Sequence, residues 1–383
     1  TEMIETTRRV WAEIDLKAFK KNLAVVSELS PNSKIFPVVK SNAYGHGVER
    51  IAKSALESPA KVTGFAVATI QEAIELHGLK LGRPILLMNG FVNREELRLC
   101  MELKLEPVIH AYYQVEIALE LMSLKPIEGA ARFWLKMNSG MNRLGMSAED
   151  CKRALFSFKS IPSLEMVFMT HLAYADDMDD PKSRSFTDKQ LSRFTQVEES
   201  VAQEFDKKLE VSISASAGVL TVPRAHRDYV RPGVMLYGSS PLAKRDGQDL
   251  GLHSVMTLSS RLISINKVLA GEAIGYNATF ICDRDTRVGT VSIGYGDGYP
   301  RSAGNGTPVL VKTSSRVIRT QVIGRVSMDM ITIDLSEIYD AQIDDEVVLW
   351  GGELGADEVA ASADTIAYEL FCKVTRRVPL TYV

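Results

Sequence analysis

The sequence predicts an α/β protein in which a (βα)8 TIM-type barrel is followed by a second, mainly β domain. From about residue 35 to about residue 240, short apolar runs alternate with amphipathic segments of helical character. Eight strand-like runs with helices between them are the pattern of such a barrel. Beyond about residue 250, the sequence consists mainly of β-branched runs broken by glycine and aspartate, and this pattern is typical of β structure.

The barrel strands are expected where short apolar runs end in polar or glycine-containing stretches. In chain order they are Ile35–Val39, Gly64–Ala68, Pro84–Met88, Glu106–Ile109, Ala131–Lys136, Glu165–Met169, Val211–Ser214 and Tyr229–Tyr237. Two helix starts support the alternation of strand and helix. Thr69 with Glu72 forms a capping-box pattern after the second strand, and Asn93 with Glu96 offers another after the third.

The second domain is expected to consist mainly of strands. These include Thr286–Ile293, Pro308–Lys312, Val317–Val322 and Glu346–Trp350. Length also favours two domains, because 383 residues exceed what one hydrophobic core usually organises. We therefore place the barrel at residues 17–249 and the mainly β domain at residues 250–383, with residues 1–16 packed against the latter.

The composition is that of an ordinary globular protein, with 45% hydrophobic and 24% charged residues. The net charge is −3, and basic and acidic residues are interspersed, so no basic face for a nucleic acid is indicated. No stretch approaches the length of about eighteen apolar residues that suggests a membrane-spanning helix. We expect neither a nucleic-acid partner nor a membrane partner.

The cysteines are far apart and match no metal-ligand spacing, so we expect no metal site. They are Cys100, Cys151, Cys282 and Cys372. Fourteen methionines beside this low cysteine count suit a reducing compartment. We therefore expect a cytoplasmic protein in which each cysteine is a small core residue.

Lys40 is the most informative single residue. It ends the apolar run Ile35–Val39 and opens the polar, glycine-rich stretch Ser41–Gly47. A lysine that faces a barrel interior from the carboxyl end of a strand is partly desolvated, which favours a neutral, nucleophilic amine able to form a Schiff base. A lysine leaving a buried strand for solvent is the alternative. The complete string Val38–Gly47 favours the first, because it closely resembles the pyridoxal phosphate (PLP) lysine motif of the alanine racemase family.

A second string, Lys136–Gly145 at the end of the fifth strand, is similar to another motif of that family. In the family, the arginine that matches Arg143 places the substrate carboxylate and hydrogen-bonds the phenolate oxygen of the cofactor, which suits a planar guanidinium. The family often carries a carbamylated lysine at the position of Lys136, whose negative charge would neutralise and orient Arg143. Without the resemblance, Arg143 would be a solvated loop residue and Lys136 a strand residue whose charged end reaches solvent.

His171, in the string Met169–Asp176 after the sixth strand, matches a histidine that lies near the cofactor ring in the family. That histidine hydrogen-bonds an arginine facing the pyridine nitrogen, and the matching residue is Arg231. An arginine does not lose its proton, so it leaves this nitrogen unprotonated and makes the ring a weaker electron sink. A short-lived carbanion suits reprotonation without decarboxylation or transamination. Taken alone, His171 would be a core or boundary residue and Arg231 a loop residue.

The phosphate site is expected after strands seven and eight, where barrels commonly bind phosphate. By resemblance, the phosphate is held by Ser216, by Gly233 and Val234, and by the hydroxyl of Tyr44. Small residues in turns are common, so this signal is informative only together with the lysine motif. The chain departs from the family at Ala215, where many relatives have asparagine, and this change affects hydrogen bonding near the phosphate.

The second domain carries further family-like strings. Gly271–Phe280 contains Tyr276, which matches the catalytic tyrosine that reaches the cofactor of the opposite subunit in the family. Gly324–Met330 implies that the backbone near Met328 receives the substrate carboxylate. Arg376 is a departure, because some relatives place there a tyrosine that touches the phosphate and narrows the pocket. Without the resemblance, Tyr276 would be an exposed loop or edge aromatic.

The resemblance implies an isomerase, namely a PLP-dependent alanine racemase that interconverts L-alanine and D-alanine as a homodimer with shared active sites. Lys40 would hold PLP and act as the base for the D-enantiomer. Tyr276 of the partner subunit would act as the base for the L-enantiomer, with His171 and Arg231 assisting. D-alanine is a peptidoglycan precursor, so the implied role is D-alanine biosynthesis or, in the reverse direction, D-alanine catabolism.

Other functions of the same fold remain as alternatives. One is a PLP-dependent decarboxylase of basic amino acids, which would place a glutamate at the pyridine nitrogen and a cysteine-bearing motif in the β domain; neither is found. A racemase of broader specificity is another. A non-catalytic PLP-binding protein resembles the barrel alone, and the second domain with Tyr276 argues against it.

Overall fold

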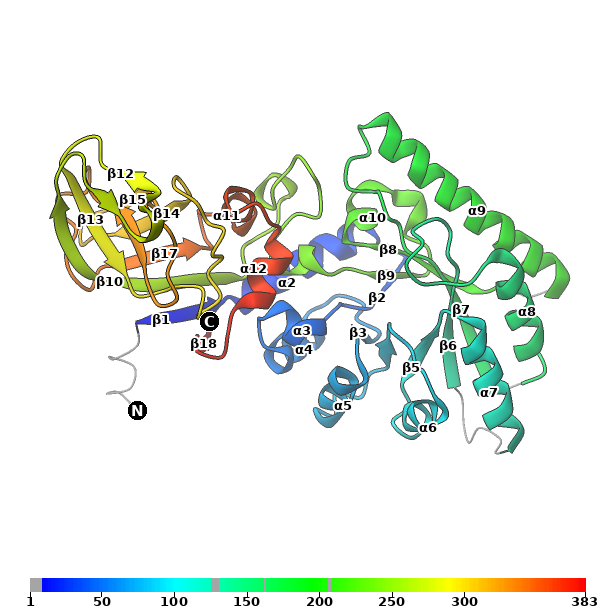
Figure 1. Ribbon diagram of the computed structural model, residues 1–383. Coiled ribbons are helices and arrows are strands. Elements are labelled where there is room, and N and C mark those ends of the chain that lie inside the picture. The colour runs from blue at the N-terminus through cyan, green and yellow to red at the C-terminus, as the bar shows by residue number, and fades with distance from the viewer. Residues whose placement is uncertain (1–8, 125–130, 162, 206–207) are drawn as a thin grey trace.

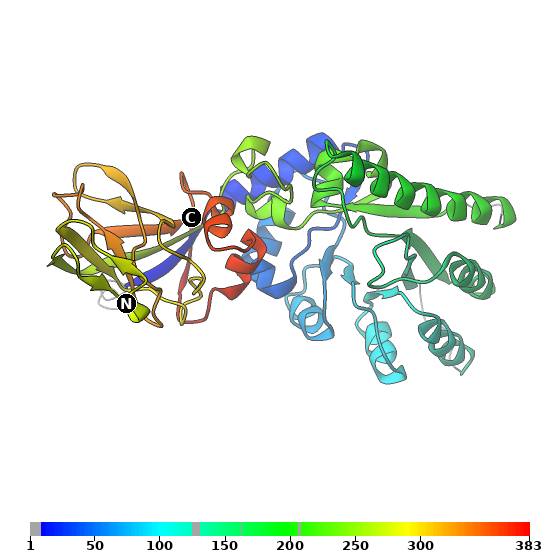
Figure 2. The same cartoon turned by 45° about the horizontal axis from the view of Figure 1, so that its top comes forward.

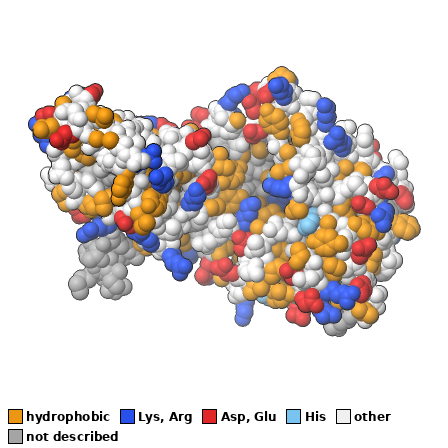
Figure 3. All heavy atoms as spheres, in the orientation of Figure 1, with side chains coloured by type: hydrophobic (Ala, Val, Ile, Leu, Met, Phe, Trp, Pro, Cys, Tyr) orange, Lys and Arg blue, Asp and Glu red, His pale blue; other side chains and the backbone are white. Residues whose placement is uncertain are grey.

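The computed structural model describes residues 9–124, 131–161, 163–205 and 208–383. The chain forms two lobes, a barrel of parallel strands and a mainly β domain, which lie side by side in Figure 1. The space-filling view of Figure 3 shows a narrower waist between the lobes, with acidic and basic side chains interspersed over the visible face. The predicted fold class is confirmed.

The barrel strands are all parallel and follow the order β2-β9-β8-β7-β6-β5-β4-β3. Isolated bridges from Ile35 to Val62 and from Val38 to Ala66 connect the two ends of this order, so the ring closes. The strands are β2 Lys34–Ile35, β3 Phe65–Val67, β4 Ile85–Leu87, β5 Glu106–Ile109, β6 Ala131–Lys136, β7 Leu164–Met169, β8 Glu210–Ala215 and β9 Tyr229–Arg231.

Helices surround the barrel on its outside, as Figure 2 shows for α5 to α9. The helices of this lobe are α2 Leu16–Leu29, α3 Lys40–Tyr44, α4 Val48–Glu57, α5 Ile70–Gly78, α6 Arg94–Glu102, α7 Tyr112–Leu124, α8 Ala148–Phe158, α9 Pro181–Phe205 and α10 Ser216–Thr221. Short 3₁₀ turns follow at η1 Pro223–Ala225, η2 Val234–Tyr237 and η3 Gln248–Leu250.

Both expected helix starts are present, but only one is a complete capping box. At α5, Thr69 Oγ1 accepts from the backbone N–H of Glu72 at 3.3 Å, and Glu72 Oε2 accepts from that of Thr69 at 3.0 Å. At α6, Asn93 Oδ1 accepts from the N–H of Glu96, while the Glu96 carboxylate accepts from Val92 rather than from Asn93. The second cap is therefore shifted by one residue.

The predicted eighth strand is wrong beyond Arg231. β9 ends there, and Val234–Tyr237 forms the 3₁₀ turn η2. Pro232 has no N–H with which to continue a ladder, and the N–H of Gly233 donates to the hydroxyl of Ser216. Similarly, Pro37 interrupts the first predicted strand, which pairs at Lys34–Ile35 and again only through the bridge at Val38.

Aromatic side chains fill the barrel near the amino ends of its strands. The Phe36 ring lies 5.1 Å from that of Trp134 and 5.6 Å from that of Tyr229, centroid to centroid. Trp134 Nε1 donates to the buried carboxylate of Glu106 at 2.7 Å, so the polar end of this large side chain is satisfied. This packing closes one end of the barrel and leaves the carboxyl ends of the strands as the place for a cavity.

The second lobe is a mainly antiparallel sheet with two short helices. Its elements are β1 Val10–Ile14, β10 Met256–Val268, β11 Ala273–Ile274, η4 Tyr276–Ala278, β12 Phe280–Ile281, β13 Thr286–Val291, β14 Pro308–Lys312, β15 Val317–Gln321, β16 Ile331–Asp334, β17 Glu346–Trp350, α11 Ala356–Ser362, α12 Ala367–Lys373 and β18 Leu380–Tyr382. The main path of the sheet is β15-β14-β17-β10-β1-β18. Helices α11 and α12 lie where the two lobes meet (Figure 1).

We propose the domain division at residues 17–249 and 250–383, with residues 1–16 belonging to the second domain. The pairing of β1 supports this division, because it runs antiparallel to β10 and parallel to β18, both in the second lobe. Residues 1–8 lie outside the described part of the chain.

The cysteines are all free thiols, and three of them are buried as expected. Burial raises the pKa of both Cys100 and Cys151 to about 12, which makes these thiols unreactive. The prediction of a core position is wrong for Cys372, which is exposed on α12. Across the described residues, we find no helix with the length and apolarity needed to cross a membrane.

Candidate active site

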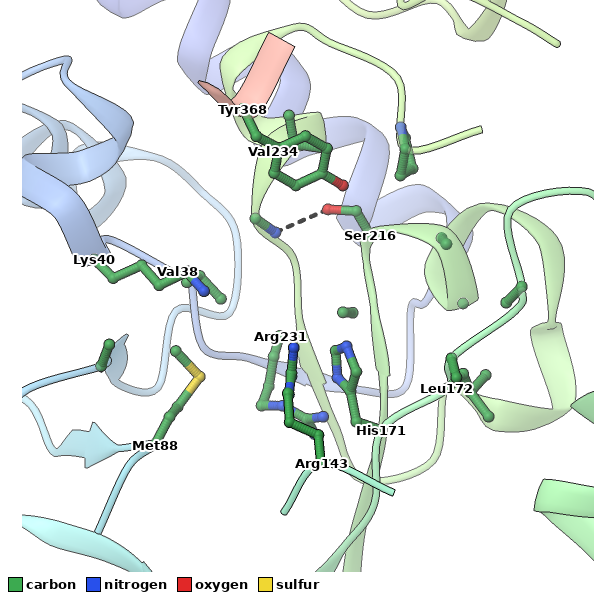
Figure 4. A pocket seen from close by; sticks show the side chains of 18 of the residues that line it. Val38, Lys40, Met88, Arg143, His171, Leu172, Ser216, Arg231, Val234 and Tyr368 are labelled. Atoms are coloured by element: carbon green, nitrogen blue, oxygen red, sulfur yellow. Dashed lines mark hydrogen bonds between the residues drawn. The ribbon is translucent and has the colours of Figure 1, made fainter. Parts of the chain in front are cut away.

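A cavity of about 770 Å³ opens at the carboxyl ends of the barrel strands. It gathers every candidate residue that the sequence placed in the barrel. These are Lys40, Tyr44, Lys136, Arg143, His171, Ser216, Arg231, Gly233 and Val234. Figure 4 shows Lys40, Arg143, His171, Ser216 and Arg231 around the same space, although they come from five different βα units. Ala215 also lines this cavity.

Lys40 begins an unusual turn. The residues Ser41 to Tyr44 all have φ of 52° or 53°, so α3 is a left-handed turn without glycine. Such a conformation costs on the order of 1–2 kcal/mol per residue. The turn ends at Gly45, where a Cβ atom would lie 2.2 Å from the carbonyl oxygen of Phe371 in α12. The sequence therefore places Lys40 and Tyr44 at the two ends of one strained, tightly packed segment.

The loop that carries Arg143 is organised by Asn138. The side-chain oxygen of Asn138 accepts from the backbone N–H of Gly140 at 3.1 Å and of Asn142 at 3.0 Å. Asn142 takes a positive φ of 59°, which asparagine tolerates better than most residues. The chain then returns to the barrel through the bridge between Met137 and Met146. This loop projects Arg143 over the cavity (Figure 4).

Lys136 is a buried cation near other cations. Burial, followed by the positive charges of Arg231, Arg143 and Lys40, lowers the pKa of its amine to about 8. An ordinary lysine has a pKa of about 10.4. At moderately alkaline pH, a large fraction of Lys136 is therefore the neutral, nucleophilic amine.

Arg231 is almost completely buried, with an exposed fraction of 2%. Its guanidinium donates to the carbonyl oxygens of Thr170 at 2.9 Å and Ile213 at 3.4 Å, and to the hydroxyl of Ser212. Burial lowers its pKa to about 10, so the group stays protonated at neutral pH. Burial of His171, followed by the positive charge of Arg231, holds the pKa of this histidine well below its ordinary value, so its imidazole is neutral.

The ring of His171 lies beside Arg231 and Arg143 in Figure 4. Among the described residues, the hydrogen bonds of the Arg231 guanidinium go to strand β8 and to Thr170, the residue that follows β7, and we find none to the His171 ring. Gln190 Nε2 donates to the backbone oxygen of His171 at 3.0 Å, which fixes the loop after β7.

A small polar cradle lies between α10 and η2. The hydroxyl of Ser216 accepts from the backbone N–H of Gly233 at 2.8 Å and of Met235 at 3.3 Å, and Figure 4 shows the first of these bonds. A Cβ atom at Gly233 would lie 2.4 Å from the hydroxyl oxygen of Tyr44, so only glycine lets that hydroxyl approach. Burial raises the pKa of Tyr44, which keeps this hydroxyl a neutral donor. The cradle fits a phosphate group.

Tyr368 is a cavity residue that sequence reasoning missed. It comes from α12 of the second lobe and lines the cavity, and its ring lies 6.1 Å from that of Tyr44. Burial raises its pKa to about 12, so its hydroxyl is also a neutral donor. Arg376, which stands where some relatives of the family have a phosphate-contacting tyrosine, is exposed and is not part of the cavity wall. The tyrosine near the phosphate cradle is therefore Tyr368.

The two candidate residues of the second domain do not join this cavity within one chain. Tyr276 begins the turn η4 and is 71% exposed, and Met328 is 53% exposed. Neither lines the cavity described above. Both are large, largely exposed side chains of the second lobe.

The charges of the cavity suit an anionic ligand. Its wall holds the basic side chains Lys40, Lys136, Arg143 and Arg231, against the single carboxylate of Asp176. A pocket with this excess of positive charge attracts anions such as a phosphate and an amino-acid carboxylate. With a primary amine at one end and a phosphate cradle at the other, the residues present fit PLP.

Comparison with known proteins assigns both lobes to domains of one family. The family model described as alanine racemase, N-terminal domain, matches residues 14–241, and the one described as alanine racemase, C-terminal domain, matches residues 255–382. The biosynthetic alanine racemase of Pseudomonas aeruginosa is 42% identical over 98% of this chain and 99% of its own length. The catabolic alanine racemase of Pseudomonas putida is also 42% identical, over 97% of this chain and 98% of its own length.

Solved structures agree with these matches. The crystal structure of the biosynthetic alanine racemase from Pseudomonas aeruginosa superposes with a TM-score of 0.89 at 40% identity, covering 98% of this chain and all of that one. Alanine racemase from Bartonella henselae, solved with covalently bound pyridoxal phosphate, superposes with a TM-score of 0.86 at 25% identity, covering 98% of this chain and 100% of that one. Since both domain models match in order over nearly the whole sequence, the chain belongs to the alanine racemase family.

Proposed function

We propose that this protein is a PLP-dependent alanine racemase, an isomerase that interconverts L-alanine and D-alanine. The observation that carries the proposal is the cavity itself, in which an amine, a phosphate cradle and two arginines meet at the carboxyl ends of the barrel strands. The membership of the chain in the alanine racemase family and the fit of the cavity residues to PLP support the proposal. In the proposed site, Lys40 holds PLP covalently, and Tyr44, Ser216, Gly233 and Val234 hold its phosphate.

The chemistry that PLP supplies when bound is delocalisation of the electron pair left behind when the Cα proton of the substrate is removed. The protein has to bind the substrate carboxylate and move a proton on each face of Cα. We assign the first task to Arg143, together with the backbone near Met328 of the partner subunit, because Met328 lies outside the cavity of its own chain. Arg231, which stays protonated and lines the cavity, would hold the cofactor at its pyridine nitrogen as a hydrogen-bond donor and so keep that nitrogen unprotonated.

We assign the two proton transfers to two opposed bases. Lys40 Nζ removes or returns the Cα proton on the side of the D-enantiomer, and Tyr276 of the partner subunit does so on the side of the L-enantiomer. A neutral His171 beside Arg231 adds no positive charge to the site and leaves room for a hydrogen bond to a bound ligand. A proton taken on one face and delivered on the other inverts the configuration.

We propose a homodimer with composite active sites. Tyr276 lies outside the cavity of its own chain and is exposed, so a lone subunit presents one base but not both. An exposed tyrosine on a protruding lobe can instead enter the cavity of a second copy, as the family arrangement implies. Recovery of activity on mixing two differently inactivated subunits tests this assembly.

The cellular role follows from the reaction. Racemisation supplies D-alanine, a peptidoglycan precursor, from L-alanine and consumes it in the reverse direction, so we propose D-alanine biosynthesis as one use and catabolism as the other. Relatives named biosynthetic and catabolic are each 42% identical to this chain. Free thiols at all four cysteines support a reducing compartment, and we propose the cytoplasm.

We further propose that Lys136 is carbamylated. Its neutral amine attacks CO2, an N–C bond forms and a proton is released, which converts a cation among cations into an anion. Because burial lowers its pKa to about 8, the reactive fraction rises as the pH increases through about 8. Labelled bicarbonate should give a carbamate signal in the ¹³C spectrum that grows over this range and is missing in Lys136→Arg. A signal of equal strength in that variant would exclude Lys136.

The proposed function is tested by incubating the protein and PLP with L-alanine. We expect D-alanine to form until the two enantiomers are present in equal amounts. Release of CO2 would instead identify a decarboxylase, and similar rates with larger amino acids a racemase of broader specificity. Binding of PLP without any change in L-alanine would leave a PLP-binding protein.

A further inference from the structure

The peptide that follows Lys40 is held by a carboxylate from outside its own turn. Glu72, in the first turn of α5, accepts from the backbone N–H of Ser41 through Oε1 at 2.8 Å. Its other oxygen accepts from the N–H of Ala68 at 2.8 Å and of Thr69 at 3.0 Å. One carboxylate thus ties the end of β3 and the start of α5 to the peptide that begins the left-handed turn.

The remainder of the turn is fixed by two further side chains. Asn42 Oδ1 accepts from the backbone N–H of Val48 at 2.8 Å, which joins the turn to α4. His46 Nδ1 lies 2.8 Å from the carbonyl oxygen of Tyr44. Burial lowers the pKa of His46 to about 4, so its ring is neutral, and this nitrogen carries the proton that it donates to that carbonyl. These contacts hold the Tyr44 end, whereas Glu72 holds the Lys40 end.

Left-handed residues other than glycine persist only where the surroundings hold them. The four residues from Ser41 to Tyr44 have this conformation, and the two cavity residues of the segment, Lys40 and Tyr44, lie at its ends. The N–H of Ser41 belongs to the peptide unit that contains the carbonyl of Lys40. Fixing this N–H therefore fixes the plane of the peptide next to Lys40, and with it the direction in which the lysine side chain leaves the backbone.

We propose that Glu72 is a positioning residue of the active site, which holds the left-handed turn so that Lys40 and Tyr44 reach the cofactor together. This inference rests on the proposed function, because it assigns Glu72 a part in the same site. Glu72 does not line the cavity itself and acts only through the backbone of Ser41.

The chain provides a matched control in Glu96. Glu72 and Glu96 occupy the third position of helices α5 and α6, which have nine residues each and follow successive barrel strands. Both carboxylates accept from backbone N–H groups at the start of their helix. Among the described residues, the bond to Ser41 distinguishes Glu72, since the Glu96 carboxylate accepts from Val92, two residues before its own helix.

The test compares Glu72→Gln with Glu96→Gln in the full chain. Glutamine keeps one acceptor oxygen but turns an N–H group toward N–H donors, so the cap survives in part and the third bond is lost. We expect Glu72→Gln to weaken PLP binding by about tenfold and to lower kcat of the PLP-saturated enzyme by a similar factor. Glu96→Gln should change PLP affinity and kcat by less than about twofold. The two variants should show similar shifts in melting temperature.

A rescue variant separates the turn from the stability of α5. Glycine adopts positive φ without the usual cost, so Ser41→Gly combined with Glu72→Gln should restore most of the lost PLP affinity. Equal PLP affinity in Glu72→Gln and Glu96→Gln, or no recovery from Ser41→Gly, would overturn the role of Glu72. If the unaltered chain racemises alanine while these variants behave alike, only this inference fails; if it neither binds PLP nor racemises alanine, the proposed function fails.

Discussion

Lys40→Ala is expected to lower alanine racemisation by at least about 10³-fold, because the substitution removes both the amine that holds PLP and one of the two bases. Lys40 is the primary amine at the start of the strained turn, and it lines the cavity opposite the arginines. Steady-state kinetics with saturating PLP measure the loss. Borohydride reduction of the unaltered protein should fix the cofactor to the peptide that contains Lys40.

Lys34→Ala is the matched control for this prediction. Lys34 begins strand β2, at the end of the barrel opposite to Lys40, and it forms a surface ion pair with Glu210 at 2.8 Å. Such pairs contribute at most about 1 kcal/mol, so activity should stay within about threefold of that of the unaltered protein. A labelled peptide that contains any lysine other than Lys40 would contradict the assignment.

The loss in Lys40→Ala should be partly reversible by mixing. In a heterodimer with a Tyr276→Phe subunit, one of the two sites combines an intact Lys40 with an intact Tyr276. With random subunit exchange, about a quarter of all sites should be complete. If activity does not return after subunit exchange has been verified, Tyr276 does not act across the subunit boundary.

The cavity residues of the barrel could be predicted because each sits in a contiguous string at the end of a strand. Lys40, Arg143 and His171 follow different strands and Arg231 ends another, and the closure of a parallel barrel brings all carboxyl ends to one rim. Strand order and helix placement then follow from the alternation of apolar runs. The fold was therefore accessible from local pattern together with one topological rule, whereas the choice of these residues as site residues came from their resemblance to the alanine racemase motifs.

Other features depend on contacts between distant segments. Tyr368 reaches the cavity only because α12 packs against α3, and no local pattern marks that helix as part of a site. The left-handed conformation of Ser41–Tyr44 contradicts the ordinary preference of its residues and exists because neighbouring elements hold it. The end of β9 at Arg231 could have been predicted, since Pro232 follows it.

Tyr276→Ala is expected to impair the two directions of proton removal unequally. If Tyr276 of the partner subunit serves the L-side, its loss should slow removal of the Cα proton from L-alanine by about 10²- to 10⁴-fold, the usual contribution of a general base. Lys40 remains in place on the D-side. Tyr339→Ala provides the control, because Tyr339 is another exposed tyrosine of the second lobe, with an exposed fraction of 80%.

The two-base account is tested most directly by following one half-reaction at a time. Overall racemisation must fall equally in both directions, because the equilibrium constant cannot change. Exchange of the Cα proton for solvent deuterium reports each enantiomer separately. The account predicts that Tyr276→Ala still exchanges D-alanine with retention of configuration while L-alanine stays almost unlabelled. Equal loss of exchange from both enantiomers would show that Tyr276 is structural and that the second base lies elsewhere.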